Sequence, residues 1–170
     1  MAPLAFLAAA GLTAVSATAA LAAPKVAVFP LELVEPIGDG FSLPKKNKSE
    51  SERVRLATEE LVRRLSESGK FEVVDTSSLA KEIADKAPLY KCNGCETDLA
   101  RKVGAEIAVV GTVDKASETL LNMTIELHDT ETGKVRGLGS TVIQGNTDEM
   151  WLRSVRWLVK NRLVQQEAPQ

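Results

Sequence analysis

One stretch of the sequence, residues 99–113, constrains the fold more than any other. A short mixed polar and apolar segment ends at Gly104, and residues 107–113 then form an apolar run that is rich in β-branched side chains. Such a run is typical of a β-strand that is covered on both faces. We therefore expect a short helix up to Gly104, followed by the central strand of a sheet around which the other elements pack.

The first 22 residues have the features of a secretory signal peptide. Residues 1–23 carry no charge, and they combine a Leu- and Ala-rich stretch with small residues around Ala22. The small residues indicate cleavage after Ala22. A membrane-spanning anchor is the alternative, but the polar threonines and serine make the segment less apolar than such an anchor. We expect residues 23–165 to form one domain in the periplasm and residues 166–170 to form a flexible tail.

The composition argues against binding to nucleic acid and against a membrane span in the mature chain. The 170 residues have a formal net charge of −2, so no global positive field attracts nucleic acid. Four Phe, two Trp and one Tyr are too few for base-stacking surfaces. Beyond the leader, no second segment is apolar for long enough to cross a bilayer. We therefore expect no nucleic-acid partner and no integral membrane segment after cleavage.

The spacing of apolar residues predicts an α/β (α+β) fold in a single domain. A mixed sheet of about five strands should follow the order β-α-β-α-α-β-β-β-α, with the helices packed on the sheet. Pro30 should lie at a bulge, an end or an edge, because proline cannot donate a ladder hydrogen bond. Asn93 and Asn146 are the expected N-caps of the last two helices. The expected strands cover residues 25–33, 71–75, 107–113, 121–128 and 135–144, and the expected helices cover 49–68, about 77–87, about 93–103 and the region from 146 onward.

Cys92 and Cys95 are the only cysteines, and their spacing allows several interpretations. A c-type haem site requires His directly after the second cysteine, where this sequence has Glu96. A closed zinc site requires four ligands, and the chain holds two Cys and one His, so a mixed-ligand or intermolecular metal site stays open. In an exported protein, a pair at this spacing is expected to form a disulfide. We expect this bond to pin the preceding loop to the start of the next helix.

A thiol–disulfide exchange site is the alternative use of the same pair. Cys95 would lie in the first turn of a helix, whose partial positive charge favours a thiolate. Thioredoxin-like enzymes, however, place a cis-proline opposite their cysteines, and the only proline after Cys95 is Pro169 in the tail. We therefore favour a structural disulfide over a redox site.

Three surfaces are candidate contacts with a partner protein. The first is the region of residues 89–96, which the disulfide would hold in shape. The second is the loop of residues 36–48, because long loops in small domains are often binding elements. The third is the last helix, where an aromatic residue lies among cations away from the apolar stripe, and where packing against the arginine stems is the alternative. The candidate contact residues on the first and third surfaces are Tyr90, Lys91, Glu96, Arg153, Arg156, Trp157 and Lys160.

His128 is the only histidine, and it lies on the polar side of an expected strand with alternating apolar and polar residues. A catalytic base needs a nucleophile or a second acid within hydrogen-bond distance, and the sequence places none beside it. We therefore expect a surface histidine, with no catalytic residue, no metal and no cofactor. The sheet face around Thr124, Glu126 and His128 stays open as a small-molecule or metal site.

The sheet pattern resembles two known domains of the bacterial envelope. Residues 25–30, 104–113 and 127–135 resemble the amino-terminal domain of TolB and the periplasmic domain of the curli secretion protein CsgG. When residues 90–96 and 151–162 are included, nearly the whole mature chain resembles a family of uncharacterised secreted bacterial proteins. The resemblance implies a non-catalytic module that engages other proteins of the Gram-negative envelope.

The leading hypothesis from the sequence is a non-catalytic periplasmic binding or accessory module that acts through contacts with an envelope protein. A periplasmic thiol–disulfide redox protein that uses Cys92 and Cys95 is the first alternative. A small-molecule or metal carrier is the second. The sequence leaves the oligomeric state open.

Overall fold

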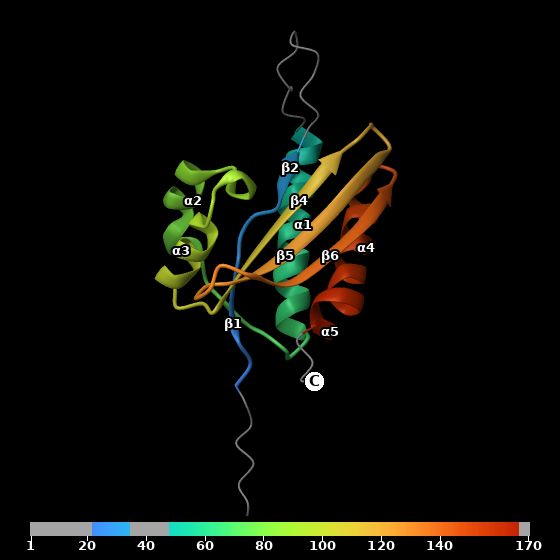
Figure 1. Ribbon diagram of the computed structural model, residues 1–170. Coiled ribbons are helices and arrows are strands. Elements are labelled where there is room, and N and C mark those ends of the chain that lie inside the picture. Colours follow the sequence, from blue (N-terminus) through green and yellow to red (C-terminus); the bar gives the residue numbers. More distant parts are fainter. Residues whose placement is uncertain (1–21, 35–47, 167–170) are drawn as a thin grey trace, which may run out of the picture.

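The apolar run predicted as the central strand forms β4 (Ile107–Lys115) in the computed structural model, which describes residues 22–34 and 48–166. β4 lies in the middle of a six-stranded mixed sheet with the order β3-β1-β4-β5-β6, and β2 also pairs with it (Figure 1). Helices pack on this sheet, as the α/β prediction requires. The other elements are β1 (Lys25–Val28), β2 (Glu32–Val34), α1 (Lys48–Glu67), β3 (Glu72–Val74), the 3-10 turn η1 (Ser77–Leu79), α2 (Ala80–Lys86), the 3-10 turn η2 (Leu89–Lys91), α3 (Cys95–Lys102), β5 (Leu120–Asp129), β6 (Val135–Gln144), α4 (Asp148–Leu158), the π-helical turn η3 (Val159–Leu163) and α5 (Val164–Gln166).

Three expectations fall mostly outside the described residues. These are the leader of residues 1–22, the loop of residues 36–48 and the tail of residues 166–170. Within the described ranges, no helix combines the length and the apolar character that crossing a bilayer requires.

The first expected strand is split in two at Pro30, so the sheet has six strands in place of about five. β1 and β2 both pair in parallel with β4, with Val28 beside Val109 and Glu32 beside Thr112. From Val28 to Glu32 the chain advances by four residues, whereas β4 advances by three, from Val109 to Thr112. One residue bulges out at Pro30, which has no N–H to donate. The prediction of a single strand is wrong, and of the three places expected for Pro30, a bulge, an end or an edge, the structure has the bulge between two short strands.

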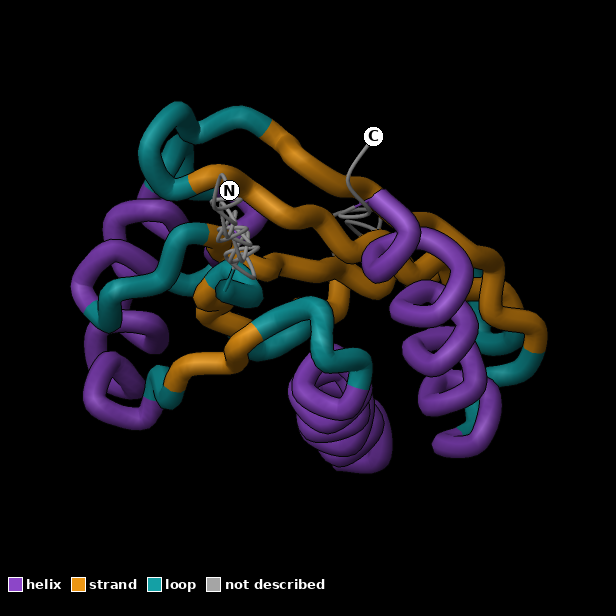
Figure 2. Tube along the Cα trace, turned by 90° about the horizontal axis from the view of Figure 1, so that it is seen from below, coloured by secondary structure: helices purple, strands orange, loops and turns teal. Residues whose placement is uncertain are grey.

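The two faces of the sheet are covered differently. One face packs on α1 and α4 in the larger core, which includes Leu61, Ile125 and Trp151. The opposite face meets the segments from η1 to α3 in a smaller core around Phe29 and Leu99. Figure 1 shows α2 and α3 grouped beside β1, away from β6, and Figure 2 shows α1 and α4 under the other part of the sheet. The outer face of β5 therefore lies beside α3 and η2 without a helix directly over it in the described part of the chain.

Strand β5 has the alternation that the sequence predicts. Its odd-numbered positions from Leu121 to Leu127 are buried, and its even-numbered positions from Asn122 to His128 are half-buried on the outer face. The predicted hairpin turn to β6 is present, with Asp129 accepting backbone hydrogen bonds and Gly133 at a φ of 70°. The polar side chains of β5 thus line one surface.

A buried polar network joins α1, β4 and α4. Glu50, at 1% exposure, accepts hydrogen bonds from Lys115 Nζ and Asn146 Nδ2, both at 2.8 Å. Asn146 Oδ1 in turn accepts the indole N–H of Trp151 at 3.0 Å. Because the Asn146 side chain is used in this network, Thr147 is the N-cap of α4 instead. The predicted cap at Asn146 is wrong for this reason.

Candidate functional site

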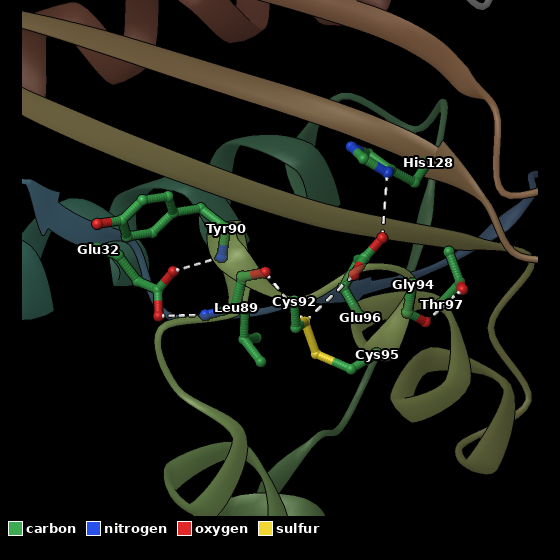
Figure 3. The surroundings of a disulfide bond; sticks show 9 residues. All are labelled: Glu32, Leu89, Tyr90, Cys92, Gly94, Cys95, Glu96, Thr97 and His128. Carbon is green, nitrogen blue, oxygen red and sulfur yellow. Dashed lines mark hydrogen bonds and ion pairs between the residues drawn. A yellow bond between two sulfur atoms is a disulfide. The ribbon is translucent and has the colours of Figure 1, made fainter.

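The loop that leads into α3 is fastened to the rest of the molecule at several points (Figure 3). Leu89 is 3% exposed and belongs to the smaller core. The carboxylate of Glu32 on β2 accepts hydrogen bonds from the backbone N–H groups of Leu89 at 2.7 Å and Tyr90 at 2.9 Å. These bonds satisfy donors at the start of η2 that no helical carbonyl can reach. The loop therefore presents Tyr90 from a fixed backbone, just after the cis peptide bond of Ala87–Pro88.

The predicted disulfide between Cys92 and Cys95 closes this loop at the start of α3, with the two Cα atoms 5.7 Å apart. Gly94 lies between them with a φ of 93°, a left-handed conformation that favours glycine. Gly94 is also the residue that precedes the first turn of α3, so the predicted N-cap at Asn93 is wrong. The bond fixes the backbone on both sides of this turn.

A groove of about 240 Å³ lies between the loop of residues 89–94, which leads into α3, and the outer face of β4 and β5. This volume is smaller than the roughly 300–1,000 Å³ of typical small-molecule pockets, so it suits an ion or one side chain of a partner. Four elements supply its polar lining, namely Tyr90 and Cys92 from the loop, Glu96 from α3, Thr112 from β4, and Thr124, Glu126 and His128 from β5.

His128 lies between two carboxylates in this groove. Its Nδ1 is 3.3 Å from Glu96 Oε1, and its Nε2 is 2.8 Å from Glu126 Oε2. The contact of Nε2 is a hydrogen bond, and the contact of Nδ1 is an ion pair when the ring carries both protons. The side chain is 16% exposed. His128 is therefore less exposed than the predicted surface histidine, and α3 brings to it Glu96, an acid that the sequence could not place.

Glu96 connects the histidine to the disulfide. It is 6% exposed, and its Oε2 lies 3.5 Å from Cys92 Sγ, which is also 3.0 Å from the carbonyl oxygen of Leu89 (Figure 3). A disulfide sulfur carries no proton, so neither contact is a hydrogen bond in the oxidised protein. A free thiol at Cys92 could donate to either oxygen. The hydrogen bonding of the groove thus depends on the redox state of the cysteine pair.

Residues that the sequence assigned to two separate surfaces meet at this one groove. Tyr90 and Glu96, from the predicted partner surface, line it together with Thr124 and His128, from the predicted ligand surface. Tyr90 is 38% exposed, and Lys91 Nζ lies 5.4 Å from the centroid of its ring. Glu96 is buried and points inward. Tyr90 and Lys91 are therefore available at the outer surface, whereas Glu96 belongs to the wall of the groove.

The predicted surface on α4 lies on the other side of the sheet. Arg153 and Lys160 are exposed, and Trp157 is 42% exposed. The guanidinium of Arg156 is half-buried and forms ion pairs with Glu149 at 2.6 Å and with α1. Arg156 therefore takes part in packing, and the other three side chains are the ones available to a partner.

Two residues that shape these surfaces were not predicted. Arg162 lies 5.5 Å from the ring centroid of Trp157, although a helix of 3.6 residues per turn would turn a residue five positions later away from it. The π-helical turn η3 changes this spacing, and the sequence carries no clear signal for such a turn. Glu32 was missed because it binds the loop of Tyr90, a segment far from it in the sequence. Its only signal was a carboxylate in an otherwise apolar strand.

Residues 24–163 match the family DUF3280, which is described as "Protein of unknown function (DUF2380)". The chain belongs to this family. The match confirms the expected membership in a family of uncharacterised proteins, and it covers nearly the whole described domain. No curated protein matches the chain at a significant level.

Several solved structures are similar to this one. The C-terminal domain of LpoB from Salmonella enterica is 22% identical over 75% of this chain and 87% of that chain, with a TM-score of 0.50. PelC from Paraburkholderia phytofirmans, a dodecamer, is 14% identical over 86% of this chain and 89% of that chain, with a TM-score of 0.51. Lipoprotein GNA1162 from Neisseria meningitidis is 16% identical over 81% of this chain and 97% of that chain, with a TM-score of 0.51. At these identities, the likeness establishes a shared fold.

TolB, which the sequence pattern resembles, also has a similar solved structure. TolB from Acinetobacter baumannii is 12% identical over 82% of this chain and 28% of that chain, with a TM-score of 0.45.

Proposed function

We propose that this chain is a non-catalytic accessory module of the bacterial envelope that binds a partner protein through Tyr90, Lys91 and the groove beside them. The observation that carries the proposal is the exposed side chain of Tyr90 on a loop, residues 89–94, whose backbone is held in place. Glu32, the buried Leu89 and the disulfide all hold that loop. A preorganised loop loses little conformational entropy on binding, and tyrosine is a residue type that often dominates protein contacts.

The groove adds a chemical preference for the partner. Glu96 and Glu126 set two carboxylates against the single imidazole of His128. Electrostatic complementarity therefore favours a cationic group, such as a lysine or arginine side chain that enters beside Tyr90. A volume of about 240 Å³ suits one such side chain.

The periplasmic location rests on the sequence and on the similar proteins. The uncharged leader indicates export, with cleavage near Ala22. One similar structure is that of a lipoprotein, and another is that of a dodecamer. The fold thus serves in a lipoprotein and in an assembly of identical copies, and both uses support a module that works through protein contacts.

Site-directed crosslinking in cells that produce the chain tests the proposal. A photo-reactive amino acid at Lys91 should capture a specific protein from the envelope. The same amino acid at Glu118, whose side chain is 80% exposed in the turn between β4 and β5, should capture none. Adding Tyr90→Ala should abolish capture from Lys91 and leave the melting temperature nearly unchanged, because an exposed side chain contributes little to folding. Equal capture from Lys91 with and without Tyr90, or from Glu118, would refute the proposal.

A redox function is the second candidate, and one specific observation favours it. Cys92 lines the groove, so the disulfide is within reach of a bound thiol. Equilibration with a glutathione series and thiol trapping measures the reduction potential of the pair. A potential below about −300 mV marks a structural disulfide, whereas one between roughly −270 and −120 mV falls in the range of exchange proteins and moves the redox function to first place.

A further inference from the structure

We propose that reduction of the Cys92–Cys95 disulfide creates a Zn²⁺ site made by the two thiolates and the carboxylate of Glu96. His128 holds this carboxylate from its other side. The proposal does not depend on the protein partner proposed above. The sequence alone left a mixed-ligand metal site open, and the structure supplies the third ligand and its support.

The three ligand atoms are already close together. One atom from each of Cys92, Cys95 and Glu96 lies within 4.8 Å of the other two. Zn²⁺ forms bonds of about 2.3 Å to sulfur and about 2.0–2.2 Å to a carboxylate oxygen, which in a tetrahedral site places sulfur and oxygen roughly 3.5 Å apart. Cys92 Sγ and Glu96 Oε2 are separated by 3.5 Å. Once the S–S bond is broken, side-chain rotation can bring the second sulfur to a similar distance.

The surroundings of Glu96 in the oxidised protein give the second, independent observation. The residue is 6% exposed, and its Oε1 faces His128 Nδ1. Its Oε2 faces Cys92 Sγ, which has no proton in the disulfide, and no side chain in the described part of the chain donates a hydrogen bond to this oxygen. In the oxidised protein, this oxygen therefore faces the cysteine pair without accepting a hydrogen bond from a described side chain. Once the S–S bond is broken, a Zn²⁺ ion held by the two thiolates would bind this oxygen directly.

His128 is the positioning residue of this site. Partners outside the ligand set commonly orient a ligating side chain, and His128 Nδ1 lies 3.3 Å from Glu96 Oε1 while Glu126 holds the other ring nitrogen by a hydrogen bond. Cys92 and Glu96 both line the groove. The fourth coordination position therefore faces the groove, where water or a side chain of a partner can occupy it.

The chemistry of the site balances with a dithiol as the reductant. The dithiol gives two electrons and two protons to the Cys92–Cys95 disulfide, which becomes two thiols while the reductant becomes a disulfide. Zn²⁺ then displaces both thiol protons, because the thiolate is the ligand. A two-electron oxidant re-forms the S–S bond and releases the ion. Thiolate ligands favour Zn²⁺ over Mg²⁺ and Ca²⁺.

Metal titration of the purified exported chain tests the proposal, with Zn²⁺ and Co²⁺ as the probes. The oxidised chain should bind neither ion. The chain reduced with dithiothreitol, which is then removed without air, should bind one Zn²⁺ per chain with a Kd below about 1 μM. Co²⁺ should add a sulfur-to-metal charge-transfer band in the near ultraviolet, a signature that surface carboxylates do not produce. The double variant Cys92→Ser/Cys95→Ser should lose both signals.

Substitutions around the site separate this proposal from simple binding by two thiolates. Glu96→Gln and His128→Gln should each weaken Zn²⁺ binding by roughly tenfold or more. Asp98→Asn is the matched control, because Asp98 is an exposed acid on the same helix that pairs with Arg101, and it should change nothing. The proposal is overturned if reduced protein binds no Zn²⁺, if two chains share one ion, or if Glu96→Gln binds as tightly as Asp98→Asn. Should Glu96→Gln fail to fold, an unchanged affinity in His128→Gln overturns the proposal equally.

Discussion

Two buried glutamates, one on each side of the sheet, differ in what surrounds them. Glu50, on the side of α1 and α4, accepts hydrogen bonds from Lys115 and Asn146. Burial opposes its ionisation, but these hydrogen bonds hold the pKa of Glu50 below its usual value. The carboxylate of Glu96, on the groove side, has its polar contacts within residues 22–34 and 48–166 with His128 and with a sulfur that carries no proton.

This difference separates a structural charge from one available for binding. The charge of Glu50 is compensated by a fixed network that ties three elements together, so the network has no place for a ligand. Glu96 is almost as buried, yet in the oxidised protein no described side chain donates a hydrogen bond to its Oε2. We therefore expect changes on the helix-covered face to affect folding, and changes in the groove to affect binding.

Aromatic residues on the two sides should give the largest contrast in stability. Trp151 is fully buried in the larger core, so Trp151→Ala should lower the free energy of unfolding by about 4 kcal/mol. Tyr90→Ala and Trp157→Ala remove partly exposed rings and should each cost about 1 kcal/mol or less. Urea unfolding of the three variants checks this order. A loss at Trp157 that equals the loss at Trp151 would place Trp157 in the core and remove it from the list of partner contacts.

The two glutamates themselves should differ next. Glu50→Gln leaves the nearly buried Lys115 with only the exposed Glu118 as its acidic partner, and we expect a loss of about 3 kcal/mol. Glu96→Gln keeps the shape and the contact with His128, and we expect a loss below about 1 kcal/mol. Urea unfolding at pH 7 measures both, with Glu52→Gln as an exposed control on α1. Equal losses at Glu50 and Glu96 would mean that both glutamates serve folding to the same degree.

Much of the fold was predictable from the sequence because its signals are local. The apolar run of β4 and the alternation of β5 each depend on a few consecutive residues. The groove was not predictable, because it depends on contacts between distant segments, such as Glu32 with the loop of Tyr90 and Glu96 with His128. Each of these residues was visible as a polar side chain, but its partner was not.

Acid should weaken the network around Glu50. The folded-state pKa of Glu50 lies below the unfolded value of about 4.5, so the unfolded chain takes up the proton first as the pH falls. The stability from this group is fully present above about pH 4.5 and is lost as the pH falls through the lower, folded-state pKa. The urea midpoint should therefore decline below this pH, and more steeply in the natural chain than in Glu50→Gln.

Other carboxyl groups determine how strongly the urea midpoint still falls with decreasing pH in Glu50→Gln. Burial of Glu60 is outweighed by hydrogen bonds from Arg64 and Arg63, which lower the pKa of Glu60, and backbone and side-chain hydrogen bonds from Thr132 lower that of Asp129. In Glu50→Gln, the part of the decrease in the urea midpoint that comes from Glu60 and Asp129 should therefore remain. An identical pH profile in Glu50→Gln and in the natural chain would show that the network does not depend on the charge of Glu50.

Loss of the disulfide should have the smallest effect on folding. Cys92 and Cys95 are three positions apart, so the bond closes a very short loop and constrains the unfolded chain by about 2 kcal/mol or less. Glu32 and the buried Leu89 continue to hold the loop when the bond is absent. Cys92→Ser/Cys95→Ser should therefore fold, with a modestly lower urea midpoint than the oxidised chain. A loss as large as that of Trp151→Ala would mean that the bond supports the whole groove side, and the pair would then be structural in both redox states.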